Sequence, residues 1–560
     1  MTGRQQGAGD EEEVGGVTPP TSIPPQQVKD RGSMGRRMGI AALMLSVSTL
    51  LSGVLGFLRD VLVTSWYAAG IQSDAYYSAF KLPDMMNYFL AGGTLSITFI
   101  PLFSAYLARG EEEQGWQLFS TIATVLGAIL VLVTLVMMAL APWIVPVIFP
   151  GFDSTEQVAL TVTMTRIVLP AQVAFYIGGL IQATLFSREV FWPAAISPLI
   201  YNVMIIAGGF FLGESFGIMG FSIGALVGAV CGPLLVPLWA ARKELRYSVR
   251  LDVRSEGFKR FLMLTLPLMF GATLVTVDSW LHAYFGSSHA EGSVTLLNHS
   301  RKLMVFLFAI IGQASGQAAL PFLSKLYASG KEQEMGAMLS GSLARVVFLA
   351  LFASAGLAVV GEPLVYVLYH HGEFSQESAQ ITTRLLWLFC IGMGAWVGQT
   401  IAARAFYARQ DTLTPMVVGT VVLAVSLPIY WLLDRELGVY GLALATSISM
   451  TLNVVAVVLT YRWRSGGELP LGPLTGAIGR GAVGATACVA VSLGAGYVLR
   501  ELFGVGEALT VTWQALTLCG VEGGIFVAVM LAYFWFASPP ESEVVMSKIR
   551  RKVLGLRRAK

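Results

Sequence analysis

Five charged side chains stand close together in an otherwise apolar stretch near the N-terminus: Arg59, Asp60, Asp74, Lys81 and Asp84. On insertion scales, each Arg, Lys or Asp at the centre of a membrane-spanning helix costs about 2.5 to 3.5 kcal/mol. If this stretch lies in lipid, the charges must therefore face a water-filled cavity, one another or a ligand.

The spacing of these charges leaves a structural role open. Asp74 and Lys81 are seven residues apart, which places them on one face of a continuous helix. Lys81 and Asp84 are three apart and can pair directly, although Pro83 between them kinks or breaks a helix. An internal set of ion pairs that fixes helix packing is one interpretation, chiefly of the acidic members.

The basic members favour a ligand-binding role. The second half of the chain supplies a cationic pair, Arg301 and Lys302, at a position that repeats that of Lys81. Two halves that each present cations to a central cavity predict an electropositive chamber, and guanidinium and ammonium groups are the usual ligands of phosphate. Asp278 is a lone acid in a neighbouring apolar segment. It could bind a coupling cation, carry a proton, or pair with Arg301 or Lys302.

The composition indicates an all-α membrane protein with many spans. The 560 residues are 55% hydrophobic and only 13% charged, with a mean hydropathy of +0.67, whereas soluble proteins carry about 25% charged residues. We expect about fourteen membrane-spanning helices. They are predicted over 39–66, 75–107, 117–149, 158–186, 193–213, 217–240, 261–286, 294–324, 340–369, 381–407, 414–433, 438–461, 473–499 and 510–537.

The connections between these segments alternate in charge. Lys and Arg gather before the first segment and after each even-numbered one, whereas the opposite connections, such as "PGFDSTEQ" and "HHGEFSQES", lack them; only Arg435 and Arg500 break this pattern. By the positive-inside rule, we expect both termini in the cytoplasm. The loops on the other side are too short for a folded domain, so function must lie within the helix bundle.

An internal repeat organises the chain. "FIPLFSAYLARGEEEQGWQLFS" from Phe99 resembles "ALPFLSKLYASGKEQEMGAMLS" from Ala319, an offset of about 220 residues. An offset that spans six helices predicts two lobes of like orientation, which favours an alternating-access transporter over a channel. The predicted parts are a disordered tail (1–35), an N-lobe (36–245), a C-lobe (258–463), two additional helices (470–540) and a basic tail (541–560).

Other chemistry finds little support in the sequence. The four cysteines lie in apolar stretches without paired spacing, so we expect neither a disulfide nor a zinc site, and the loop pair His370–His371 is expected to be solvated. A glycosyltransferase or polymerase would need a catalytic carboxylate outside the membrane. The acids in the short connections there have no recognisable motif, so we expect no enzyme. These acids are Asp153, Glu156, Glu214, Glu291, Glu373 and Glu377. We also expect no nucleic-acid partner and a functional monomer.

Several motifs resemble one known family. "GFLRD" and "SDAYYSAFKLPD", followed by "SITFIPLFSAY", "LPFLSKLY" and "RAFYARQDTLTP", are similar to the MurJ (MviN) lipid II flippases of the multidrug/oligosaccharidyl-lipid/polysaccharide (MOP) exporter superfamily. The resemblance covers about residues 36–540. It implies movement of undecaprenyl-diphosphate-linked disaccharide-pentapeptide across the bacterial cytoplasmic (inner) membrane for peptidoglycan synthesis.

The resemblance also implies roles for individual residues. It places Arg59, Asp60, Asp74 and Lys81 in a central substrate-binding cavity, with Lys302 as the essential cation of the second lobe and Arg301 beside it. Asp278 and Thr446 fall at or near positions where some members bind a coupling cation. The segment "VVLAVSLPIYWLL" lacks an Asn/Asp pair, however, so sodium, protons and the membrane potential all remain possible driving forces.

Some positions depart from the proteobacterial pattern. Asn87 replaces an arginine, Gly92 and Val305 replace glutamates, and Leu307 replaces a proline. The cavity is thus expected to be less charged than in those members. These departures fit either a divergent flippase or a paralogue that carries another polyprenyl-linked glycan. An exporter of cationic drugs should show an acid-dominated cavity, whereas this one carries several cations. A scaffold for cell-wall assembly, in which the cavity charges are dispensable, is a further alternative.

Overall fold

The computed structural model describes residues 25–90, 98–269, 274–502, 512–543 and 546–547. Within these ranges every regular element is a helix, and twelve helices are long and apolar enough to cross a membrane. The predicted all-α, multi-span fold is therefore confirmed. The predicted segments 75–107 and 261–286 are not among the twelve, since each includes residues outside the described ranges, so the count of fourteen remains a prediction.

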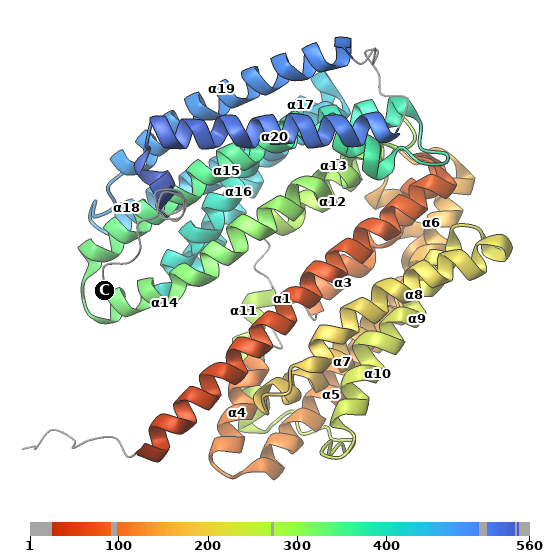
Figure 1. Cartoon of the computed structure of the whole chain (residues 1–560). Helices are drawn as coiled ribbons and strands as arrows, with labels where there is room; N and C mark the ends of the chain where they lie inside the picture. Colours follow the sequence, from red (N-terminus) through yellow and green to blue (C-terminus); the bar gives the residue numbers. More distant parts are fainter. Residues whose placement is uncertain (1–24, 91–97, 270–273, 503–511, 544–545, 548–560) are drawn as a thin grey trace, which may run out of the picture.

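The N-lobe is a compact helical bundle that forms the lower right half of Figure 1. Its helices are α1 (Pro25–Tyr67), α2 (Ile71–Ala79), α3 (Lys81–Leu90), α4 (Ile100–Ala108), α5 (Glu112–Ile148), α6 (Thr155–Val168), α7 (Ala171–Ser187), α8 (Trp192–Phe216), α9 (Met219–Ala229), the π-helix η2 (Val230–Leu234) and α10 (Leu235–Ala241).

The C-lobe forms the upper half of Figure 1. Its membrane-spanning helices are followed by α19 and α20, which both pack on α15. The helices are α12 (Leu274–Gly286), α13 (Ser293–Phe308), the π-helix η3 (Ala309–Gln313), α14 (Ala314–Ala328), α15 (Glu332–Tyr369), α16 (Gln376–Ala408), α17 (Leu413–Leu437), α18 (Val439–Arg464), α19 (Gly472–Leu502), α20 (Thr512–Phe536) and the short 3-10 helix η4 (Pro540–Ser542).

The internal repeat is visible in the turn geometry. The turns after α7 and α16 each contain a residue in the left-handed region, Glu189 (φ 62°) and Gln410 (φ 60°). The preceding arginine of each turn forms an ion pair with the first residue of a long helix: Arg188 with Glu112 in α5, and Arg409 with Glu332 in α15. The two lobes therefore share the same local construction about 220 residues apart.

Two predicted boundaries are wrong. Helix α1 begins at Pro25, so residues 25–35 continue the first helix and only residues 1–24 of the expected tail lie outside the described residues. The helix α11 (Glu256–Met269) was assigned to the C-lobe, but it contacts α3 and α5 of the N-lobe. Its buried Phe258 and Phe261 join the N-lobe core, and this apolar burial holds the helix there.

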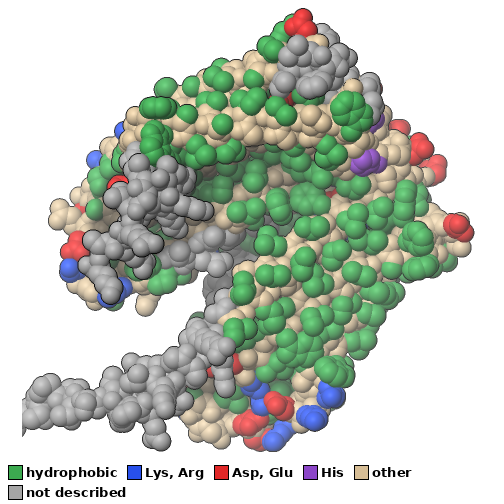
Figure 2. All heavy atoms as spheres, in the orientation of Figure 1, with side chains coloured by type: hydrophobic (Ala, Val, Ile, Leu, Met, Phe, Trp, Pro, Cys, Tyr) green, Lys and Arg blue, Asp and Glu red, His purple; other side chains and the backbone are tan. Residues whose placement is uncertain are grey.

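The two lobes meet at one end of the molecule and diverge at the other (Figure 1). We call the end with the Lys- and Arg-rich connections the basic end and the opposite one the closed end. At the closed end, the Glu373 amide donates to the Ser65 carbonyl over 2.9 Å, and the Gly151 amide donates to the Ser287 hydroxyl over 3.4 Å. Figure 2 shows the hollow between the lobes, which opens on the side of the basic end.

Glycine permits the close approach at the closed end. A Cβ atom on Gly372 would lie 2.1 Å from the Ser65 carbonyl oxygen, and one on Gly292 would lie 2.4 Å from that of Ala69. Both glycines also have positive φ, 59° and 90°, a conformation that residues with a side chain rarely adopt. These positions let two backbones from different lobes touch.

Candidate functional site

Asp60 is the electrostatic centre of the lobe interface. Its carboxylate is fully buried on α1 and accepts from the Arg59 guanidinium over 2.9 Å. It also forms an ion pair with Lys302 of α13, whose ammonium donates in addition to the Gly56 carbonyl over 2.9 Å. One carboxylate thus neutralises a cation from each lobe. Three of the predicted substrate-binding residues are brought together here, although as partners of one another.

Asp74 contacts the N-terminus of α13 and, contrary to the sequence prediction, does not share a helix face with Lys81. Its carboxylate accepts from the amides of Gly292 and Thr295, both over 2.8 Å, and from the Thr295 hydroxyl over 2.6 Å. Gly292 is the N-cap of α13 and Thr295 lies in its first turn, where unpaired amides favour an anion. Asp74 of the N-lobe therefore caps a C-lobe helix at the closed end, and all its described contacts are of this kind.

Lys81 and Asp84 do not form the predicted pair. Helix α2 ends at Ala79 and α3 begins at Lys81, so Asp74 and Lys81 are not on one continuous helix either. Asp84, in the first turn of α3, is exposed to the cavity, and no ion pair within 4.0 Å joins it to Lys81. Among the residues that the structure describes, Lys81 has neither a salt bridge nor a hydrogen bond, so its ammonium is available to a ligand.

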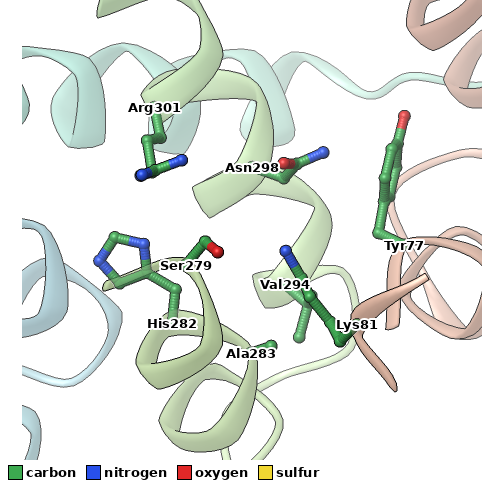
Figure 3. Close-up of a pocket in the computed structure, with 8 residues that line it drawn as sticks. All are labelled: Tyr77, Lys81, Ser279, His282, Ala283, Val294, Asn298 and Arg301. Atoms are coloured by element: carbon green, nitrogen blue, oxygen red, sulfur yellow. The ribbon is translucent and has the colours of Figure 1, made fainter. Parts of the chain in front are cut away.

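A pocket at the lobe interface brings Lys81 and Arg301 together (Figure 3). Lys81 enters from α3, whereas Arg301 and Asn298 enter from α13. The Lys81 and Arg301 side chains point towards the middle of the pocket, and the Asn298 amide points towards Tyr77. An adjoining cavity of about 250 Å³ shares Lys81 and Asn298 and adds Arg59 and Asp84. One cation from each lobe thus lines this pocket, while the role of the chamber in substrate binding stays a prediction.

Asp278 is saturated by neighbours within the C-lobe. It accepts from the Arg301 guanidinium over 2.7 Å, from the Tyr430 hydroxyl over 2.5 Å and from the Thr446 hydroxyl over 2.7 Å. The His282 Nε2 lies 3.7 Å from the same carboxylate. The two predicted coupling-ion residues, Asp278 and Thr446, therefore do meet.

The surroundings of Asp278 do not fit a bound sodium ion. A sodium site needs several free oxygen ligands, but both Asp278 oxygens already accept hydrogen bonds and the nearest positive charge is Arg301. A second cation on this carboxylate would stand beside a guanidinium of like charge. In the part of the chain that the structure describes, no group of three or more His, Cys, Asp or Glu side chains could hold a metal.

The structure also adds residues that the sequence did not single out. Asn298 borders both cavities, while His282 and Tyr430 complete the Asp278 network. Sequence spacing gives no signal for them, because their partners lie on helices far away in the chain. Of the positions that depart from the proteobacterial pattern, Val305 and Leu307 pack against the C-lobe core.

Asn87 is half-buried on α3, and Gly92 lies outside the described residues. The four cysteines are unpaired in the structure. The His371 ring donates through Nε2 to the Val367 carbonyl over 2.7 Å, and the His370 ring lies against Tyr366. Neither histidine contacts the cavity residues described above.

The fold is that of the MOP superfamily of transporters. The structure superimposes on the lipid II flippase MurJ in an inward closed conformation with a TM-score of 0.73 and 19% identity, covering 89% of this chain and 100% of that chain. An inward-facing multidrug resistance MATE family transporter of the MOP superfamily gives a TM-score of 0.62 and 14% identity, covering 76% of this chain and 98% of that chain.

Sequence comparison identifies the family. The family model for the lipid II flippase MurJ matches residues 64–511. A probable lipid II flippase MurJ of Rhizobium meliloti is 27% identical, covering 90% of this chain and 94% of the relative. The lipid II flippase MurJ of Burkholderia cenocepacia is 29% identical, covering 76% of this chain and 84% of the relative. The chain belongs to the MurJ family.

Proposed function

We propose that this protein moves lipid II, an undecaprenyl-diphosphate-linked disaccharide-pentapeptide, from the inner to the outer leaflet of the bacterial cytoplasmic membrane. Family membership supports the substrate, and the observation that carries the mechanism is the unpaired ammonium of Lys81 in the cavity between the lobes. The diphosphate enters this cavity from the basic end, while the polyprenyl tail stays in lipid.

The diphosphate binds first where positive charge is free. Lys81 has no anionic partner among the described residues, and the Arg301 guanidinium engages Asp278 through one nitrogen, Nε, so its other donors can reach a phosphate. Asn298 lines the same pocket and can hydrogen-bond a phosphate or sugar oxygen (Figure 3). Arg59 and Lys302 follow as second ligands because they are already paired with Asp60.

Substrate binding also weakens the contact between the lobes. The ion pair of Lys302 with Asp60 joins α13 to α1, so a diphosphate that competes for Lys302 releases one interlobe bond. The lobes then separate at the closed end by alternating access. The chemistry is transport without bond making, so we assign no catalytic residue and no cofactor.

The proposed orientation places the basic end in the cytoplasm. The first described residues of α1 and the described residues after α20 lie at that end, in agreement with the positive-inside rule (Figure 1). The protein acts as a monomer in this scheme, because each chain carries both lobes and the cavity between them. Lipid II and the surrounding membrane lipids are its partners.

We further propose that transport needs no sodium. Arg301 supplies the positive charge that Asp278 requires, within 2.7 Å, so the driving force is the membrane potential or a proton gradient. Replacing sodium by choline in a proteoliposome flipping assay should leave the rate unchanged within about twofold. A rate that rises in proportion to sodium would refute the role given to Arg301.

Complementation of cells depleted of their own lipid II flippase tests the function. The wild-type protein should restore growth, and Lys81→Ala should not, at equal membrane expression. Lys331→Ala is the matched control, because Lys331 is an exposed cation paired only with Glu334 at the basic end. Rescue by Lys81→Ala would mean that the cavity charge is dispensable. Failure of the well-expressed wild type in several hosts would indicate another polyprenyl-linked glycan.

A further inference from the structure

A cluster of buried polar aromatic side chains separates the cavity from the closed end. It consists of Tyr76 and Tyr77 of α2, His299 of α13 and Tyr369, the last residue of α15; we call it the gate cluster. Their exposed fractions are 1%, 7%, 0% and 0%. The three hydroxyls and both ring nitrogens of His299 have no hydrogen-bond partner among the described residues.

The gate cluster crosses the lobe interface. The His299 ring stacks on Tyr369 with centroids 4.3 Å apart and planes at 9°, and Tyr77 meets the edge of His299 at 5.5 Å. Tyr77 lines the inward cavity, whereas Tyr369 adjoins the loop whose Gly372 touches Ser65. The cluster thus extends from the cavity to the contact that closes the far end.

Packing alone does not explain these polar atoms. Buried hydroxyls and imidazole nitrogens without partners destabilise the state that buries them, and the great majority in native proteins are paired. Phenylalanine would fill the same volume without that penalty, as it does at the neighbouring Phe80 and Phe374. Any conformation that gives these polar atoms partners is therefore favoured relative to this one.

We propose that the gate cluster is the outer half of the transport path. This inference rests on the proposed function. When α2 parts from α13, the hydroxyls and the imidazole face the opening and hydrogen-bond the hydroxyl- and amide-rich headgroup of the substrate, with the aromatic faces beside the sugar rings. Their unpaired burial in the closed state also shifts the lobe equilibrium towards opening.

The first test measures opening without substrate. The four native cysteines are replaced by alanine and Ser73→Cys is introduced as a reporter, because Ser73 is fully buried and its hydroxyl contacts Thr295 of the other lobe. A membrane-impermeant maleimide added from outside labels this cysteine only when the closed end opens. Tyr77→Phe and Tyr369→Phe should each decrease the labelling rate about fivefold to tenfold, since each removes an unpaired hydroxyl.

The control is Tyr176→Phe, which should leave labelling unchanged. Tyr176 is equally buried, but its hydroxyl donates to the Ile122 carbonyl over 3.2 Å within the N-lobe. Unchanged or increased labelling in both Tyr77→Phe and Tyr369→Phe would overturn the proposal, because the hydroxyls would then be neutral or stabilising in the closed state.

The second test asks whether the headgroup touches the cluster. Lipid II with a photoreactive diazirine on the disaccharide is flipped by the wild-type protein in proteoliposomes and illuminated during turnover. Adducts on Tyr77, His299 or Tyr369, located by mass spectrometry, are the expected result. Transport without adducts at these residues would overturn the inference and leave the proposed function standing, whereas absence of transport would count against the proposed function itself.

Discussion

Substitution of Asp60 by asparagine should open the closed end of the molecule. The change keeps the shape of the side chain but leaves Arg59 and Lys302 without their shared carboxylate. Removing one partner of a buried ion pair costs about 3 to 5 kcal/mol. The side chains of Arg59 and Lys302 retain exposed fractions of 20% and 27%, so water in the cavity offsets part of this free-energy cost. We therefore expect a cost at the lower end of that range, about 3 kcal/mol.

Only part of that cost affects the lobe equilibrium. Arg59 shares α1 with Asp60, so its contact persists in every lobe arrangement, whereas the Lys302 contact joins α1 to α13. About half of the cost, roughly 1.5 kcal/mol, therefore falls on the closed arrangement alone, and this corresponds to about tenfold more opening. External maleimide labelling of a Ser73→Cys reporter should increase by that factor in Asp60→Asn.

Asp84→Asn provides the matched control. It also neutralises a cavity carboxylate of the N-lobe, but Asp84 is exposed and joins no described ion pair. Labelling in this variant should stay within about twofold of the parent. If Asp60→Asn labels no faster than Asp84→Asn, the Lys302 pair does not hold the lobes together and the proposed release by diphosphate is wrong.

Two further predictions concern the loops at either end. Gly372→Ala places a Cβ atom 2.1 Å from the Ser65 carbonyl oxygen at a φ of 59°, so the closed end should be destabilised by about 1 to 3 kcal/mol and external labelling should rise; unchanged labelling would show that the loop adapts. At the basic end, burial acts to raise the pKa of Asp411, but hydrogen bonds from Thr414 and the charge of Arg464 outweigh it and hold this pKa below its ordinary value. The stability that Asp411 contributes should therefore be complete at neutral pH and be lost as the pH falls below about 4. Thermal unfolding in detergent should show this loss in the parent and not in Asp411→Asn, and equal acid sensitivity of both proteins would contradict it.

The architecture could be predicted from the sequence because its determinants are local. Span positions follow from runs of apolar residues, and the repeat follows from the similar segments that begin at Phe99 and Ala319. The cationic chamber could also be predicted, because a charge in an apolar helix must face a polar environment. What could not be predicted are the partners: Asp74 caps a helix that begins more than 200 residues later, at Ser293, and no local pattern encodes that contact.

One error comes from a broken helix. The predicted face shared by Asp74 and Lys81 assumed one continuous helix, but the chain breaks at Phe80. The assignment of α11 to the C-lobe has another cause, because no local pattern indicates that Phe258 and Phe261 pack in the N-lobe core. Hydropathy detects an apolar segment but neither a break such as that at Phe80 nor the lobe against which the segment packs.

The pairing of the cavity charges determines the order in which they can act. Arg301 is neutralised by Asp278 within one lobe, so a rocking motion leaves that pair intact. Lys302 is neutralised by Asp60 across the lobes, so the same motion breaks it. Lys81 has no anionic partner in the described structure and is the first cation that an incoming diphosphate can neutralise. In the proposed mechanism, binding at Lys81 and Arg301 brings negative charge towards Lys302, where it replaces Asp60 as the counterion and removes a bond between the lobes. The proposal therefore predicts that an anionic headgroup opens the closed end, whereas a neutral one of the same size does not.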